Sequence, residues 1–174
     1  RGVTKIESRD ETAERAAIQT AIEVGFDKRA IIEEFAVGTE YSVECLSWNG
    51  RHAFLCMTLK YTTGAPHFIE TGHLEPAPVD DAMLEKVKKI TFHALDSLKI
   101  RYGASHTELK IDNDGNVKLI EIGSRMGGDC IGSSLVQLTT GVDFVKAVID
   151  VALGKEHNIE KKGKLTASGI RFVF

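Results

Sequence analysis

Apolar side chains recur every three or four positions in three stretches of the chain, with polar side chains between them. This spacing lines up the apolar side chains along one side of an α-helix, where they can pack against a core. Gly141 lies within the third stretch, and we expect the helix to break near it. The predicted helices span residues 13–24, 83–98 and 135–153.

Residues that cap helices flank the first two stretches. Ser8 and Glu11 match a capping box, in which each side chain can satisfy an unpaired backbone N–H at the start of a helix. Gly25 follows the first stretch and suits the end of a helix. Before the second stretch, either Asp80 or Asp81 can serve as the N-cap.

Short runs rich in β-branched and aromatic residues predict strands between the helices. Asn49-Gly50 separates two such runs and favours a tight hairpin. Residues 62–79 contain all three prolines, so we expect an irregular, exposed loop there. The predicted strands cover residues 3–6, 30–35, 41–48, 51–61 and 165–174, together with the two arms of a second hairpin over 103–122.

Strands that pair through hairpins, with helices between them, predict an α+β fold and not a doubly wound parallel sheet. The chain has 174 residues, of which 43% are hydrophobic. That is enough for one packed core with a smaller lobe attached. The chain does not begin with methionine, and we expect it to be a fragment of a longer protein.

Composition excludes several kinds of partner. The net charge of -3 provides no basic surface for nucleic acid or an anionic membrane. No apolar run is long enough to span a bilayer, and no signal peptide is visible, so no membrane partner is expected. Cys45, Cys56 and Cys130 lack the spacing of a metal site, and we interpret them as reduced core residues of a cytoplasmic protein.

The second hairpin carries the main chemical prediction. If Asp114-Gly115 forms a two-residue type I′ turn, Glu108 lies directly across from Glu121. Side chains in such a pair have Cβ atoms roughly 4.5–5.5 Å apart, and two like charges there destabilise the sheet. Strand alternation places His106 on the same face as Glu108.

Two opposed carboxylates call for a positive charge, and three interpretations remain open. A divalent cation such as Mg²⁺ could bind both carboxylates. The carboxylates could instead share a proton, as an acid–base pair does. Finally, Lys110 and Arg125 could neutralise both acids in a surface cluster.

The sequence SRMGGD follows Glu121 directly. Arg125 offers a guanidinium group, and Gly127-Gly128 would let an anion approach the backbone closely. A metal ion beside an anion-binding loop is what a phosphate-transferring site needs. Taken alone, the two glycines also fit an ordinary turn.

A second candidate segment is IIEEFAVGTEYSVE, residues 31–44. A strand that becomes a linker can present backbone N–H and C=O groups to a planar base. The carboxylate of Glu40 could accept hydrogen bonds from ribose hydroxyls. Taken alone, this stretch is better explained as an ordinary strand edge with solvated acids.

Three blocks, RGVTKIES, IIEEFAVGTEYSVE and HTELKIDNDGNVKLIEIGSRMGGD, occur in an order that resembles the ATP-grasp superfamily over nearly the whole chain. HTEL and EIGSRMGGD are most similar to the carboxylate–amine ligases, the L-amino-acid ligase and carnosine-synthase-like group. Carbamoyl-phosphate synthetase, biotin carboxylase and D-alanine ligase are more distantly similar. The resemblance implies an ATP-grasp fold, with residues 1–35 in a truncated small lobe and 36–174 in the large lobe that holds the metal and phosphate site.

The resemblance also implies which residues bind the nucleotide. Glu34 and Ala36 would contact adenine through their backbones, and Glu40 would bind the ribose. Gly127 and Gly128 would form the loop on the substrate side.

Further implied roles concern the phosphates of ATP. Glu108 and Glu121 would ligate Mg²⁺ (or Mn²⁺) that bridges these phosphates. Arg125 would stabilise the transferring phosphoryl group or the acyl-phosphate. His106 matches a position that relatives often give to an anion-contacting residue.

The implied activity is an ATP-dependent carbon–nitrogen ligase, which activates a carboxylate as an acyl-phosphate and couples it to an amine, such as that of an amino acid. Gly123 departs from the family pattern, which has Asn there, and the phosphate loop and lysine would lie upstream of Arg1. The expected partners are therefore small-molecule substrates and the missing N-terminal part, with a homodimer possible. Two alternatives remain: a non-catalytic or regulatory nucleotide-binding module, and a purine-precursor or carbamoyl-phosphate type of ligase.

Three other polar side chains stay ambiguous. Lys60 could reach a phosphate or lie at the surface. His67 and His73 could line the acceptor-substrate pocket, because relatives carry a similar loop there, or they could have no role.

Overall fold

The computed structural model describes residues 2–7, 9–64, 67–157, 159–160 and 166–174. The chain divides into two compact units. The first contains residues 1–36 and 63–69, and the second contains residues 37–62 and 70–174. Each unit is described by itself.

The first unit contains one regular element, the helix α1 (Glu11–Val24), among its described residues. Its N-cap is Asp10, whose Oδ1 accepts a hydrogen bond from Thr12 N at 3.0 Å. The predicted partner Ser8 lies outside the described residues, whereas the predicted end at Gly25 is confirmed, because its N–H donates to Ala21 O at 2.9 Å.

The strands predicted over residues 3–6 and 30–35 are wrong. Both segments are irregular in the structure. A strand needs a neighbour to satisfy its backbone N–H and C=O groups, and neither segment has one among the described residues. β-Branched composition alone does not make a strand under these conditions.

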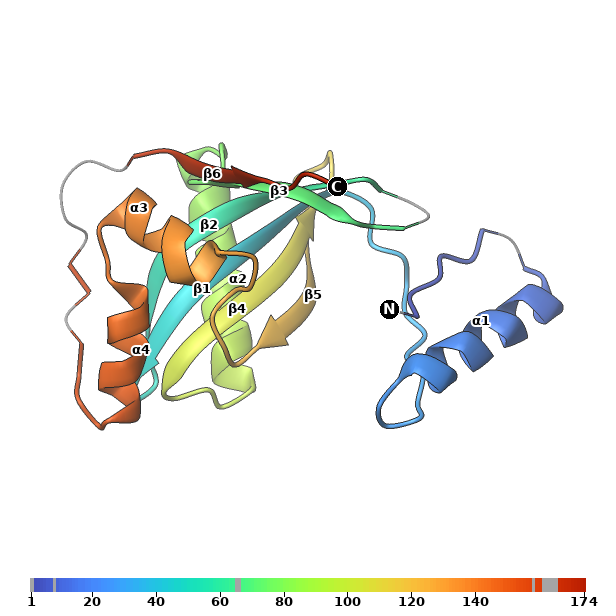
Figure 1. Ribbon diagram of the computed structural model, residues 1–174, viewed down its shortest axis with the longest axis horizontal. Helices are drawn as coiled ribbons and strands as arrows, with labels where there is room; N and C mark the ends of the chain where they lie inside the picture. The colour runs from blue at the N-terminus through green and yellow to red at the C-terminus, as the bar shows by residue number, and fades with distance from the viewer. Residues whose placement is uncertain (1, 8, 65–66, 158, 161–165) are drawn as a thin grey trace. The chain divides into compact units, whose positions relative to one another are not determined.

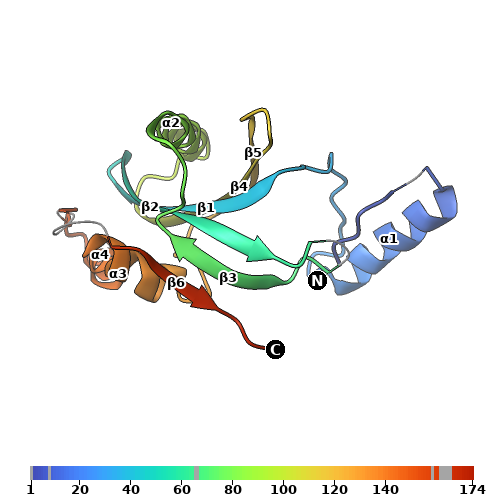
Figure 2. The ribbon, with the colours of Figure 1, turned by 90° about the horizontal axis from the view of Figure 1, so that it is seen from above.

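The second unit is built on a six-stranded antiparallel sheet with the order β5-β4-β1-β2-β3-β6 (Figures 1 and 2). The Asn49-Gly50 hairpin is confirmed, and both residues have the positive φ angles that a tight turn requires. The predicted loop over 62–79 is wrong in part, because it includes the third strand. The strands are β1 (Thr39–Trp48), β2 (Arg51–Thr62), β3 (Glu70–Glu75), β4 (Gly103–Ile111), β5 (Val117–Gly123) and β6 (Ser168–Arg171).

Helices cover both faces of this sheet. Figure 2 shows α2 (Asp81–Ser97) on one side, with α3 (Val136–Thr140) and α4 (Phe144–Ala152) on the other. A π-helical turn, η1 (Ile131–Leu135), leads into α3. The predicted break at Gly141 is confirmed, since this residue ends α3 with a φ of 74°.

Each helix layer buries its own apolar cluster. On one face, Val87 and Leu95 of α2 pack with Val43 and Leu109 of the sheet. On the opposite face, α3 and α4 pack against the half of β1 that leads to the hairpin, with Phe144 at 1% exposure. The remaining half of that face carries no helix-packed cluster and holds charged side chains instead. None of the described helices is long and apolar enough to cross a membrane.

The turn of the second hairpin differs from the prediction. Asp112 faces Asn116, whose backbone N–H donates to Asp112 Oδ1 at 2.8 Å. Three residues therefore lie between them in place of two, with Gly115 in the left-handed region at a φ of 76°. The type I′ turn at Asp114-Gly115 is wrong.

An irregularity in β5 restores the predicted pairing. Leu109 pairs with Leu119, but the next residue of β4, Glu108, pairs with Glu121. Ile120 is thus an extra residue, a β-bulge, that shifts the register by one. Glu108 and Glu121 are directly opposed as predicted, although the longer turn alone would have placed them one residue apart.

The start of α2 provides a test of the fold. Asp80 Oδ1 accepts from Met83 N at 2.7 Å, which settles the choice between Asp80 and Asp81. We expect Asp80→Ala to lower the free energy of unfolding by about 1 kcal/mol, because the helix loses this cap. Asp80→Asn keeps an equivalent acceptor and should leave stability nearly unchanged. Urea denaturation measures both, and equal losses in the two variants would contradict the capping role.

Candidate active site

Charged side chains from four adjacent strands, β4, β1, β2 and β3, gather on the sheet face opposite α2. Cross-strand pairing places Glu40 beside Lys110, Ser42 beside Glu108 and Glu44 beside His106. The intervening residues Tyr41, Val43 and Leu109 point to the α2 side, as strand alternation requires. The predicted common face of His106, Glu108 and Lys110 follows from this register.

Glu108 is held by two cations. Lys60 Nζ donates to Glu108 Oε1 at 2.9 Å, and His106 Nε2 lies 3.2 Å from the same oxygen. The hydrogen bond from His106, followed by the contact with Lys60, lowers the pKa of Glu108 to about 2 despite partial burial. Glu108 is therefore a carboxylate throughout the neutral range and not the protonated partner of a shared-proton pair.

His106 is enclosed between two carboxylates. Its Nδ1 contacts Glu44, and its Nε2 faces Glu108. Burial lowers the pKa of His106, but the hydrogen bonds to Glu108 and Glu44 outweigh this and raise it to about 9. The second oxygen of Glu44 accepts from Gly127 N at 2.9 Å, so the imidazolium ring is fixed through Glu44 to the loop after β5.

Lys60 lies on β2 and links this strand to three others through ion pairs. Its ammonium group lies 2.6 Å from Glu70, 2.9 Å from Glu108 and 3.4 Å from Glu40, and its side chain is only 2% exposed. Burial lowers the pKa of Lys60, but Glu70 and Glu108 more than compensate and raise it. The sequence left Lys60 undecided. The pairing of the first hairpin shifts between Glu44 and Cys45, and this irregularity, which the sequence did not indicate, brings Lys60 to the side of Glu40.

Glu121 completes the carboxylate pair from the neighbouring strand. It is exposed, lies across from Glu108, and makes no hydrogen bond or ion pair within the described ranges. Arg125 is also exposed and donates to the backbone carbonyl of Met126 at 3.0 Å. Lys60 and His106, and not Arg125, thus contact Glu108, while Lys110 lies 3.8 Å from Glu40.

Similarity to known proteins identifies the family to which this fold belongs. The family model described as the ATP-grasp domain matches residues 1–133. The chain belongs to the ATP-grasp domain family. The predicted family and α+β fold are thereby confirmed.

Individual relatives are ligases. Human carnosine synthase 1 is 29% identical over 133 residues, which are 76% of this chain and 16% of that protein. Alanine–anticapsin ligase from Bacillus subtilis is 30% identical over 95 residues, which are 54% of this chain and 20% of that protein. A solved L-amino acid ligase from Bacillus licheniformis superposes with a TM-score of 0.74 at 29% identity, covering 86% of this chain and 36% of that one. The chain spans less than a third of the length of these curated relatives.

The two glycines of this ATP-grasp chain have different environments. A Cβ atom on Gly127 would lie 2.6 Å from Glu44 Oε1 and 2.8 Å from His106 Nδ1. A Cβ atom on Gly128 would meet no atom within 4 Å. The Gly127 N–H is already used by Glu44, so this residue supports the buried Glu44–His106 pair. No such contact restricts Gly128.

The residues expected to bind adenine and ribose are divided between the two units. Glu34 and Ala36 belong to the first unit and lie outside regular structure. Glu40 belongs to β1, where its carboxylate contacts Lys60 and Lys110. Glu40 is part of the charged network that contains Glu108. The three binding roles remain predictions.

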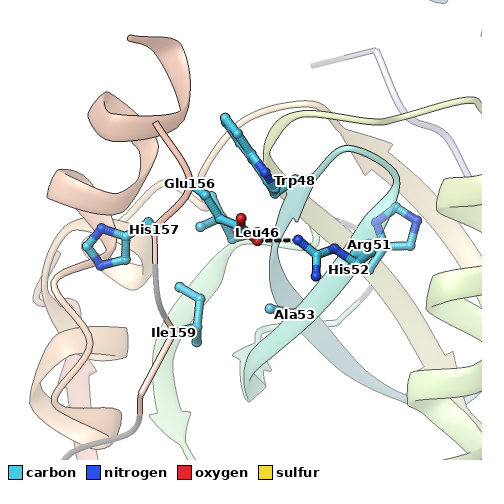
Figure 3. A pocket seen from close by; sticks show the side chains of 8 residues that line it. All are labelled: Leu46, Trp48, Arg51, His52, Ala53, Glu156, His157 and Ile159. Atoms are coloured by element: carbon cyan, nitrogen blue, oxygen red, sulfur yellow. Dashed lines mark hydrogen bonds and ion pairs between the residues drawn. The ribbon is translucent and has the colours of Figure 1, made fainter. Parts of the chain in front are cut away.

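Outside the network, a hollow of about 490 Å³ lies at the hairpin end of the sheet. Trp48, Arg51 and His52 of the first hairpin face Glu156 and Ile159 across it (Figure 3). Glu40 lies at the other end of β1, so the hollow is not part of the charged network. Of the cysteines, Cys45 and Cys56 are buried as predicted, but Cys130 is exposed and the core assignment is wrong for it.

The contrast between the two glycines leads to a stability prediction. We expect Gly127→Ala to lower the free energy of unfolding by about 1–3 kcal/mol, since the added methyl group collides with Glu44 and His106. Gly128→Ala is the matched control and should change stability by no more than about 0.5 kcal/mol. Chemical denaturation of both variants measures the difference, and equal effects would show that the Glu44–His106 pair does not exclude a side chain.

Glu75 gives a pH-dependent prediction. It is fully buried, accepts from Thr58 Oγ1 at 2.7 Å, and has one oxygen without a partner. Burial raises the pKa of Glu75 from 4.5 to about 7. The folded state therefore binds this proton more tightly than the unfolded chain, which favours folding below pH 4.5, and the advantage disappears as the pH rises towards 7.

We expect Glu75→Gln to remove this dependence, because glutamine stays neutral. The stability of the unchanged chain relative to the variant should fall by up to about 3 kcal/mol between these pH values. Urea denaturation at a series of pH values measures this difference. Parallel stability curves for the two proteins would show that Glu75 does not hold a proton in the fold.

Proposed function

We propose that this chain is the ATP-binding part of a ligase that activates a carboxylate as an acyl-phosphate and joins it to an amine, with an amino acid as one substrate. The observation that carries the proposal is the direct pairing of Glu108 and Glu121 on the charged sheet face. Membership of the ATP-grasp family supports it, as do relatives named as carnosine synthase, alanine–anticapsin ligase and L-amino acid ligase.

The carboxylate pair fits Mg²⁺ (or Mn²⁺) in its chemistry. Both residues offer hard oxygen ligands, and Glu121 has no competing partner in the described parts of the chain. Lys60 and His106 both contact Oε1 of Glu108, so they compensate one of the two opposed carboxylates. In the proposed enzyme, Glu108 and Glu121 would hold Mg²⁺, which would supply positive charge near the phosphates of ATP.

The proposed reaction has two steps. A carboxylate oxygen of the first substrate attacks the γ-phosphorus of ATP, and the bond to the bridging oxygen of ADP breaks. An amine then attacks the acyl carbon, and inorganic phosphate leaves with its electron pair. The protein's contribution is mainly positioning and charge stabilisation, as in other phosphoryl transfers.

Each charged residue has a proposed part in these steps. Arg125, exposed after β5, would contact the transferring phosphoryl group or the acyl-phosphate. His106 would keep Glu108 ionised and oriented, since it contacts that carboxylate directly. Glu40 would bind the ribose, and Glu34 with Ala36 the adenine through their backbones.

Gly123 favours a second candidate, a nucleotide-binding module without catalysis. This position follows the metal carboxylate Glu121 by two residues and offers no side-chain ligand where the family pattern has Asn. A Cβ atom here would lie 3.4 Å from Arg125 Cγ, an ordinary contact, so the backbone itself does not exclude a larger residue. The side-chain ligand is therefore absent because position 123 is a glycine, and not because the structure lacks space for a larger residue there.

Other parts of the proposal concern the surroundings of the domain. Residues 1–35 would belong to the small lobe and 36–174 to the large lobe, with further sequence upstream completing the nucleotide site. A reducing, cytoplasmic location is part of the proposal, as the cysteine spacing in the sequence suggested. A homodimer remains a prediction.

ATP-dependent phosphate release by the full-length protein, measured across the amino acids, tests the proposed function. We expect release that requires an amino acid and Mg²⁺, and that Glu121→Gln lowers about a hundredfold or more through the loss of a charged metal ligand. Glu85→Gln, at an exposed acid of α2 paired with Lys88, is the matched control and should keep full activity.

The outcomes separate the two candidates. ATP binding without phosphate release, for any amino acid offered, would overturn the ligase and support the non-catalytic module. Equal activity in the Glu121→Gln and Glu85→Gln variants would overturn the assignment of the metal ligand.

A further inference from the structure

The hollow at the hairpin end of the sheet has an apolar wall. Leu46, Trp48, Ala53 and Ile159 contribute this wall. Trp48 and Ile159 are partly buried and pack against the core cluster that contains Leu46. The volume of about 490 Å³ lies within the range of about 300–1,000 Å³ that is common for small-molecule sites. The hollow therefore offers both room and apolar surface to a small ligand.

One cation and one anion also line this hollow. Arg51 of β2 and Glu156, in the segment after α4, form an ion pair across it (Figure 3). The two residues lie 105 positions apart in the sequence, so the fold brings them together. Their side chains are 73% and 55% exposed, and an ion pair in solvent contributes little to stability. The two charged groups can therefore separate at low cost and bind a ligand instead.

The two histidines of the lining already have partners. His52 Nδ1 lies 2.7 Å from Ser47 Oγ, and its Nε2 lies 3.2 Å from Asp96 Oδ1. His157 Nδ1 lies 2.7 Å from Asp150 Oδ2. The exposed ion pair is therefore the main source of charge that a ligand meets in the hollow.

We propose that this hollow binds a free amino acid with an apolar side chain, such as leucine. The α-carboxylate pairs with Arg51, whose planar guanidinium group can hold both carboxylate oxygens. The α-ammonium group pairs with Glu156. The apolar side chain lies against Trp48 and Ile159, where its burial favours binding.

Charge complementarity selects this class of ligand. The opposite charges of Arg51 and Glu156 cancel, so a phosphate or another multiply charged anion would be attracted by one and repelled by the other. An uncharged apolar molecule would offer neither group a new partner. A zwitterion replaces the ion pair with two equivalent pairs, while its side chain covers the apolar wall.

The hollow shares no residue with the charged network. The network begins on β1 with Glu40 and extends to Glu44, whereas the hollow is lined from Leu46 onward. Binding in the hollow needs neither ATP nor Mg²⁺, so this site goes beyond the proposed ligase activity and does not depend on it. A binding experiment without nucleotide therefore tests it independently.

Trp48 provides the readout, because it lines the hollow and is the only tryptophan of the chain. Leucine titrated into the full-length protein without ATP should change the tryptophan fluorescence saturably, and Trp48→Phe should abolish this change. We expect the affinity to fall at least about tenfold in Arg51→Gln and in Glu156→Gln, since each variant loses a charge-assisted hydrogen bond to leucine. Arg101→Gln, at an exposed arginine that donates to Asn49, is the matched control and should bind leucine like the unchanged protein.

Three compounds test the separate groups of the ligand. Leucinamide lacks the carboxylate, 4-methylpentanoate lacks the ammonium group, and glycine lacks the apolar side chain. Each should bind at least about tenfold more weakly than leucine. Equal affinity for 4-methylpentanoate and leucine would identify an anion site and overturn the proposal.

Three further results would overturn the proposal. The first is the absence of leucine binding in both fluorescence and calorimetry. The second is unchanged affinity in Arg51→Gln and in Glu156→Gln, two variants that should fold because both side chains are exposed. The third is loss of the Trp48 signal in Arg125→Gln with retention in Arg51→Gln, which would place the amino acid at the proposed active site. Failure of the proposed ligase activity would appear instead in phosphate release and would leave leucine binding unchanged.

Discussion

The buried ammonium group of Lys60 is the interaction on which the charged face depends. It contacts carboxylates from β1, β3 and β4, and its own strand, β2, runs between β1 and β3. A charge in such a place is tolerated only when it is paired, and removing one partner leaves the others uncompensated. A single side chain therefore holds Glu108, Glu70 and Glu40 relative to one another. A substitution at any one of these residues should therefore affect the other two.

Two β-bulges in the sheet determine on which face the charged side chains lie. The bulge at Ile120 brings Glu121 opposite Glu108, and the bulge at Thr71 puts Glu70 and His73 on one face. Regular strands would point one member of each pair to the wrong side of the sheet. Bulges commonly re-aim side chains beside active sites, and here both serve the charged face.

Local signals predicted much of the fold. The Asn49-Gly50 hairpin, α2 and the break at Gly141 follow from turn residues, apolar spacing and a glycine, all of which act over a few residues. The strands expected over 3–6 and 30–35 failed because strand formation depends on a distant partner. The pairing of Glu108 with Glu121 was correct although its turn was wrong, because an unpredicted bulge offset the unpredicted extra turn residue. The partners of Lys60 and the pairing of Arg51 with Glu156 depend on tertiary contacts that no local pattern contains.

The loop after β5 shows how support and function are divided within one short motif. Gly127 gives its N–H to Glu44 and leaves no room for a side chain beside His106. It therefore acts on Glu108 indirectly, through the imidazolium ring that Glu44 fixes. Gly128, with open space around it, carries no such constraint. A glycine pair that the sequence suggested as an anion loop is thus half structural, whereas Arg125 in the same loop is exposed.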